Sequence, residues 1–144
     1  MKKIFDMQFI RYINLFGRVT KISAKHCFSY NNMLVYVIQR NQIERAIGKD
    51  NINLKRLSKI LDKRIRVVAE PNGIEDMQRF ISVIISPIQI QGLEVKDKDN
   101  NKEVAISAGG RENKAMLIGR QRSREAELKD ILEQYFGVKT LKII

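Results

Sequence analysis

The stretch AIGKDNINLKRL, residues 46–57, places a glycine and three polar residues between two segments with helical apolar spacing. We predict short helices over residues 41–48 and 52–61. The second of these has four apolar residues at core spacing: Ile52, Leu57, Ile60 and Leu61. Glycine allows a bend, and the first N–H groups of a helix have no acceptor inside that helix. The stretch therefore predicts a helical hairpin whose bend exposes main-chain N–H groups.

Strand and helix patterns flank this hairpin on both sides. The predicted elements are a helix over residues 4–16, strands over 26–30 and 33–38, and a strand over 64–70. Gly17 stands where a helix stop is expected. Asn31 and Asn32 tolerate the positive φ of a tight hairpin turn. The order is thus helix, strand, strand, helix, loop, helix, strand.

The same order returns in the second half of the chain. Pro71, Asn72 and Gly73 favour a turn, so we expect domains over residues 1–70 and 71–144. The later elements are a helix over 75–85, strands over 88–96 and 103–108, helices over 111–119 and 123–136, and a strand over 138–144. The tetrapeptides AIGK and LIGR start 71 residues apart, and this offset superimposes three apolar pairs: Leu57 on Leu128, Ile60 on Ile131 and Leu61 on Leu132. This match indicates a duplication.

Positive charge is concentrated in the first half of the chain. Lys and Arg outnumber Asp and Glu by 27 to 16 overall, by 15 to 5 in residues 1–70, and by 12 to 11 in residues 71–144. Such a field attracts anionic partners, so nucleic acid is the first partner class and an acidic membrane surface the second. No apolar run approaches the roughly 20 residues that cross a bilayer. We expect a cytoplasmic monomer.

No set of residues points to catalysis, a metal or a cofactor. Cys27 is the only cysteine, and beside His26 it makes too small a set for a metal site or a nucleophilic pair. Gly109 and Gly110 lack the spacing of a phosphate-cradling loop, and the acidic run over residues 97–103 lacks that of a calcium loop. We therefore expect a protein that is not an enzyme.

Each half resembles the KH domain in its prokaryotic, type II arrangement, whose helix pair is joined by a Gly-x-x-Gly loop. The doubled array resembles the archaeal NusA-like transcription factors, over nearly the whole chain. This resemblance implies an α+β fold of two tandem type II KH domains, each a small three-stranded mixed sheet packed by helices on one face. It also implies binding of single-stranded RNA, a role in transcription elongation, termination or antitermination, and RNA polymerase or other transcription proteins as partners.

The resemblance transfers RNA-binding roles to two loops and their surroundings. KH loops clamp about four backbone nucleotides. The corresponding loops are Gly48-Lys49-Asp50-Asn51 and Gly119-Arg120-Gln121-Arg122, in which Lys49 and Arg120 would meet phosphate. An apolar groove for bases would draw on Ile43, Ile47 and Ile52 in the first half, and on Met116, Ile118 or Leu117 in the second. Some of these must be packing residues, because one face cannot be both groove and core. Further phosphate contacts would come from Arg45, Lys55, Arg56 and Lys59 in the first half, and from Lys114, Arg122 and Arg124 in the second.

Both loops depart from the family pattern at the second glycine. Asn51 enters left-handed conformations more readily than most residues, so the first loop is expected to keep its shape. Arg122 would pay roughly 1 kcal/mol or more for a positive φ. We therefore expect a reshaped second loop and stronger RNA binding by the first.

Two other classes of function use the same residues. A helix-turn-helix DNA-binding protein would place residues 52–61 in a major groove, although strands on both sides of the helix pair count against it. An adaptor of the same fold would dock RNA polymerase or a ribosomal particle with little RNA contact. Charge reversal at Lys49 would leave such an adaptor active.

Overall fold

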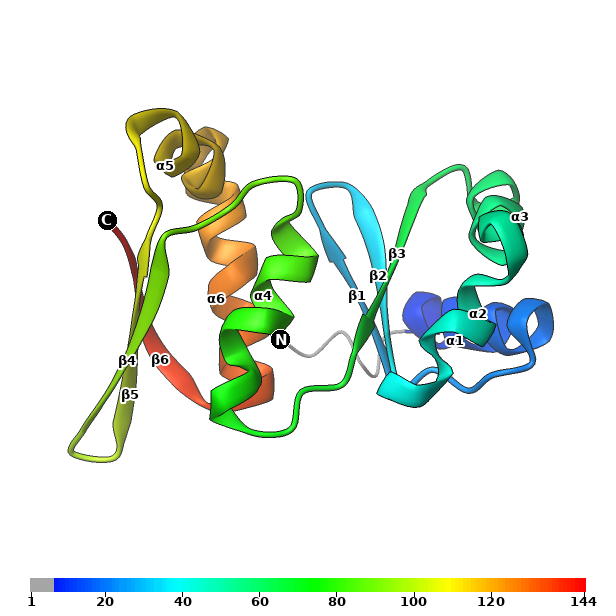
Figure 1. Cartoon of the computed structure of the whole chain (residues 1–144), viewed down its shortest axis with the longest axis horizontal. Coiled ribbons are helices and arrows are strands. Elements are labelled where there is room, and N and C mark those ends of the chain that lie inside the picture. The colour runs from blue at the N-terminus through cyan, green and yellow to red at the C-terminus, as the bar shows by residue number, and fades with distance from the viewer. Residues whose placement is uncertain (1–6) are drawn as a thin grey trace. The chain divides into compact units, whose positions relative to one another are not determined.

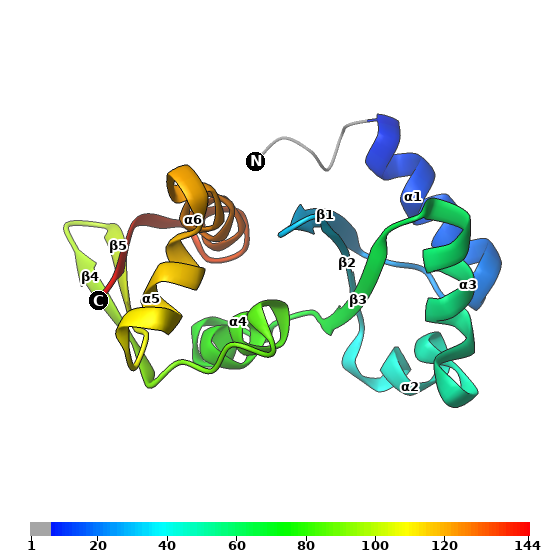
Figure 2. The same ribbon diagram turned by 90° about the horizontal axis from the view of Figure 1, so that it is seen from above.

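The protein is represented by a computed structural model that describes residues 7–144, in two compact units (Figure 1). One unit ends at Glu70, and the other runs from Pro71 to Ile144. Each unit contains a mixed three-stranded sheet with helices on one side, which is the α+β arrangement of type II KH domains (Figure 2). Within residues 7–144 no helix is both long and apolar enough to cross a membrane.

The first unit begins with a helix and a hairpin. Its elements are α1 (Met7–Thr20), β1 (His26–Tyr30), β2 (Met33–Ile38), α2 (Ile43–Ile47), α3 (Ile52–Leu61) and β3 (Arg64–Ala69). β2 lies between an antiparallel β1 and a parallel β3. Asn31 and Asn32 make the turn of the hairpin with φ of 53° and 58°, because asparagine accepts the left-handed conformation that such turns require.

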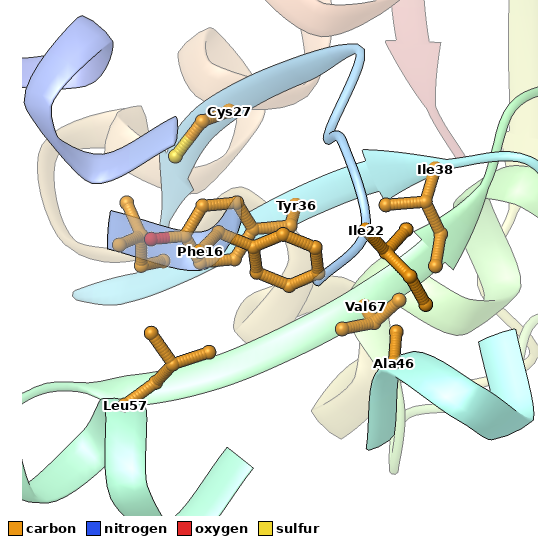
Figure 3. Close-up of a cluster of buried hydrophobic side chains, with 9 residues drawn as sticks. Phe16, Ile22, Cys27, Tyr36, Ile38, Ala46, Leu57 and Val67 are labelled. Atoms are coloured by element: carbon orange, nitrogen blue, oxygen red, sulfur yellow. The ribbon is translucent and has the colours of Figure 1, made fainter. Parts of the chain in front are cut away.

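The core of the first unit forms where α1, α2 and α3 meet one face of the sheet. Phe16 from α1 and Tyr36 from β2 stack with ring centroids 4.3 Å apart, and Leu57 from α3 approaches the same cluster (Figure 3). The Tyr36 hydroxyl donates a hydrogen bond to the Tyr12 carbonyl oxygen at 2.8 Å. Burial raises the pKa of Tyr36. The aromatic side chains of these strands are therefore packing residues.

The end of α1 differs from the prediction. Gly17 lies inside the helix, which continues to Thr20; the predicted start, at residues 4–6, lies outside the described residues. The Thr20 hydroxyl donates to the Phe16 carbonyl oxygen at 2.8 Å and accepts the Ile22 N–H at 3.1 Å. Lys21 then turns into the left-handed region with φ of 64°. A side-chain bond at Thr20 thus ends the helix, and glycine does not.

The predicted core face of α3 is only half correct. Leu57 is fully buried and Leu61 is partly buried, but Ile52 is 44% exposed and Ile60 is 59% exposed. In the second unit, Ile131 stands 71 residues after Ile60 and is 1% exposed. α3 and its counterpart in the second unit have the same apolar spacing, but the side chains at equivalent positions are buried to different extents.

The second unit repeats the element order. Its elements are α4 (Met77–Ile85), β4 (Gly92–Lys98), β5 (Asn101–Ser107), α5 (Arg111–Ile118), α6 (Ser123–Phe136) and β6 (Val138–Ile143). β5 is the central strand, antiparallel to β4 and parallel to β6. Phe80 of α4 packs on Tyr135 and Phe136 of α6, with ring centroids 5.0 and 5.9 Å apart.

The start of β4 also differs from the prediction of residue 88. The segment over residues 88–91 is not part of the strand, although the Gln91 N–H donates to the Ser107 carbonyl oxygen of β5 at 2.8 Å. The Asn113 side-chain amide donates to the Gln89 carbonyl oxygen at 3.0 Å and to the Ala108 carbonyl oxygen at 3.2 Å. These bonds tie the segment to the start of α5 and delay the strand by four residues.

Candidate nucleic-acid interface

The first loop is a sharp bend between α2 and α3. Gly48 has φ 80° and ψ 169°, a combination that is essentially restricted to glycine. Asp50 and Asn51 follow in left-handed conformations, at 56°, 31° and 60°, 27°. The Gly48 N–H donates to the Glu44 carbonyl oxygen at 3.0 Å, and the Asn51 N–H donates to the Gly48 carbonyl oxygen at 3.2 Å. The helix is therefore interrupted, and its direction changes within four residues.

The tip of this loop is open to solvent. Lys49, Asp50 and Asn51 are all exposed. The N–H groups of Lys49 and Asp50 form no hydrogen bond within residues 7–144. Two main-chain donors therefore face solvent at the N-terminal end of α3, where the helix dipole favours an anion.

Side chains next to the loop hold its two helices together. The Asn53 side-chain amide donates to the Ala46 carbonyl oxygen at 3.1 Å and to the Arg45 carbonyl oxygen at 3.4 Å, and so joins α3 to the end of α2. A Cβ atom added at Gly48 would lie 2.9 Å from Ile52 Cγ2 and 3.0 Å from Asn53 Nδ2. Glycine is thus needed for both its backbone angles and its small volume.

The second loop has the same backbone shape as the first, contrary to the expectation that it is reshaped. Gly119 has φ 75° and ψ 171°, and Gln121 and Arg122 are left-handed at 56°, 29° and 60°, 26°. The Gly119 N–H donates to the Ala115 carbonyl oxygen at 2.9 Å, and the Arg122 N–H donates to the Gly119 carbonyl oxygen at 3.1 Å. The local bonds and packing hold Arg122 in the left-handed region despite its Cβ.

Ion pairs distinguish the second loop. Arg122 Nε donates to Glu125 Oε1 at 2.7 Å and Arg122 Nη2 to Oε2 at 3.3 Å, a two-pronged contact. Arg124 Nη1 lies 3.1 Å from Glu127 Oε1. The hydrogen bond from Arg122 to Glu125, together with the carboxylate charge, raises the pKa of the Arg122 guanidinium. The sequence analysis missed Glu125, although its spacing three residues after Arg122 on a helix was a usable signal.

The basic residues around the two loops have different surroundings. In the first unit Arg45, Lys55, Arg56 and Lys59 are all exposed, and α3 contains no acidic residue. In the second unit Lys114 and Arg120 are exposed and Arg124 is partly buried, while α6 carries four acidic residues. The helix that follows the first loop is therefore more positive than the helix that follows the second, although the first loop itself contains the acidic Asp50.

The predicted groove residues divide into surface and core. In the first unit Ile43 and Ile47 are partly buried, with Ile43 against the core cluster, and Ile52 is exposed beside the loop. In the second unit Met116 is 51% exposed and Ile118 is partly buried. Leu117 is fully buried and is therefore one of the packing residues. It occupies the core position that Ala46 fills in the first unit.

Burial affects both Cys27 and His26. Cys27 is buried in the core cluster, and this burial raises the pKa of its thiol. Burial also lowers the pKa of His26, which Glu70 partly opposes. Among residues 7–144 no group of three or more potential metal-ligating side chains is clustered.

The curated relatives of this chain share one description. No family model matches the chain. It is 28% identical over 94% of its length, and 76% of the relative's, to "Probable transcription termination protein NusA" of Methanococcus vannielii. Proteins of the same description in Halococcus morrhuae and Thermoplasma acidophilum are 22% and 20% identical over 93% and 96% of this chain, and 93% of each relative. A solved structure described as "Crystal structure of APE1850" matches 97% of this chain and 100% of its own, with a TM-score of 0.70 and 25% identity.

Proposed function

Because the chain is an archaeal NusA-like protein with KH-type units, we propose that it is an RNA-binding transcription factor that holds single-stranded RNA at its two loops. It acts without catalysis, in elongation, termination or antitermination. The support for a role in transcription is the description of its relatives as probable transcription termination proteins. The support for RNA as the ligand is the geometry of the loops together with their charge.

One observation carries the proposal: the first loop presents unbonded N–H groups on an exposed bend. A phosphate oxygen accepts hydrogen bonds from the Lys49 and Asp50 N–H groups without displacing any internal bond. The exposed Lys49 ammonium adds charge at the same place. Gly48 has no side chain to hold a sugar-phosphate chain away from the main chain. These features favour a single strand, whose backbone can follow the bend while its bases turn aside.

The surroundings of the first loop support a larger share of binding there. Arg45, Lys55 and Arg56 add positive charge close to the bend, and exposed Ile52 offers an apolar surface to a base. The second loop has the same backbone, but carboxylates accompany its arginines. We infer that the first unit provides most of the RNA affinity and that the second extends the contact along the strand.

A salt titration with single-stranded and duplex RNA tests the proposal. Fluorescence anisotropy with a labelled RNA of about 12 nucleotides, in single-stranded form and annealed to its complement, gives both affinities between about 50 and 200 mM salt. We expect tighter binding of the single strand and an affinity that falls as salt rises. Equal affinity for the duplex, or the absence of binding at the lowest salt, would refute it.

A further inference from the structure

The two loops have the same backbone shape, but they differ in the residue that lies three positions after the end of the loop. Glu125 lies three residues after Arg122, and both of its carboxylate oxygens accept hydrogen bonds from that guanidinium. At the equivalent place in the first unit, 71 residues earlier, stands Leu54, which packs against the core cluster. The first unit therefore has no carboxylate at this place, and its loop acid is the exposed Asp50 at the tip.

The geometry of the pair leaves the arginine reachable. The Arg122 side chain is 72% exposed, whereas the Glu125 side chain is 16% exposed and rests against the protein. Two-pronged contact with a carboxylate uses the same donor geometry that an arginine offers to a phosphate. Glu125 occupies the Nε and Nη2 edge of the guanidinium, so an RNA phosphate must either displace the carboxylate from that edge or use the remaining N–H donors against its negative charge.

We propose that Glu125 is a specificity-determining residue that holds Arg122 and thereby weakens RNA binding at the second loop. This inference rests on the proposed function. Because the Arg122 side chain is exposed, a phosphate can reach it, so the Glu125 carboxylate lowers the RNA affinity of the second loop without abolishing it. The second loop is then the weaker of two RNA-binding sites, and in the unsubstituted chain its binding is aided by the strand that the first unit already holds.

A purely structural role for Glu125 leads to a different expectation. Acidic residues in the first turn of a helix interact favourably with its dipole, and Glu125 occupies such a position in α6. Glutamine is also common at this place in helix starts, so Glu125→Gln keeps one acceptor oxygen for the helix start while it removes the charge and the second acceptor for Arg122. A helix-starting role would change the melting temperature, but it would not link the RNA affinity to Arg122.

The test uses the full chain with the first loop weakened by Lys49→Glu, so that the second loop dominates the signal. Asp130→Asn is the matched control, because Asp130 is an exposed acid on the same helix, far along the chain from the loop. With a labelled single-stranded oligouridine, we expect Glu125→Gln to tighten binding about two- to five-fold and to steepen the salt dependence. Asp130→Asn should produce a smaller gain, and adding Arg122→Ala to Glu125→Gln should remove it.

The outcomes separate the two proposals. Equal gains from Glu125→Gln and Asp130→Asn would show a general charge effect and would overturn the role of Glu125 alone. A gain that persists with Arg122→Ala would overturn it as well. If the unsubstituted chain fails to bind the RNA at low salt, the proposed function itself is wrong. Melting curves of each variant establish that all of them are folded.

Discussion

Single residues determine the shape of both loops, and they do so unequally. Gly48 and Gly119 occupy a region of φ and ψ that side chains hardly enter. Asn51 and Arg122 occupy the left-handed region, which costs a residue with a side chain about 1–2 kcal/mol. The motif thus requires glycine at its first position, whereas its last position accepts any residue whose neighbours compensate this cost.

We expect Gly119→Ala to destabilise the second unit by about 1–3 kcal/mol. The new Cβ would lie 2.5 Å from Arg124 Cγ and 3.0 Å from the Arg124 backbone nitrogen, in addition to the backbone strain. Urea denaturation measures the free energy of unfolding. Gly92→Ala is the control, because an added Cβ there meets no atom within 4 Å and should cause no loss. Equal effects of the two substitutions would contradict this account of the loop.

Secondary-structure elements with the same apolar spacing are buried differently in the two units. α3 buries Leu57 and leaves Ile60 59% exposed, whereas α6 buries both Leu128 and Ile131. Spacing along a helix defines which side chains share a face. How much of that face is covered depends on the angle and position of the neighbouring elements, which the helix does not encode.

Along α3, we expect Leu57→Ala to lower the free energy of unfolding by about 2–5 kcal/mol, because it leaves a cavity in the core of the first unit. Ile60→Ala should change it by no more than about 0.5 kcal/mol, since that side chain is mostly in solvent. Denaturant titrations of the two variants provide a comparison within one helix. A loss at Ile60 as large as at Leu57 would show that Ile60 is packed.

Across the whole molecule, charge is distributed unevenly between units of the same fold. Residues 1–70 contain 15 basic and 5 acidic side chains, and residues 71–144 contain 12 and 11. The two units therefore have the same fold but very different net charges. Long-range attraction of a polyanion acts mainly on the first unit.

We expect Lys49→Glu to weaken binding of single-stranded RNA on the order of tenfold, and the matched change Arg120→Glu to weaken it about two- to threefold. The reason is that Lys49 lies in the more positive unit, while Arg120 lies in a loop beside which Arg122 and Arg124 are paired with glutamates. Anisotropy at fixed salt measures both. Equal losses would assign the loops equal shares, and unchanged binding in both variants would favour the adaptor function.

Much of the architecture could be predicted from local patterns. Apolar periodicity, the Asn31-Asn32 turn and the 71-residue repeat indicated the order of elements, and the resemblance to KH domains implied the mixed sheets. Element ends were less predictable, because they depend on side-chain bonds such as that of Thr20 at the end of α1 and that of Asn113 before β4. Glycine and basic residues in the sequence indicated both loops, but the sequence analysis did not identify Glu125 as the partner of Arg122.

The amino-acid pattern alone was sufficient for the order of elements, the duplication and the two bends, because periodicity and backbone preference are properties of short segments. The fold type followed from the resemblance to KH domains. Packing in three dimensions settled which isoleucines are exposed, that Leu117 belongs to the core, and that the second loop keeps its shape around Arg122. It also brought Glu125 onto Arg122. The physical reason is that burial and ion pairing depend on the distance between groups in space, and many folded arrangements are compatible with the same local periodicity.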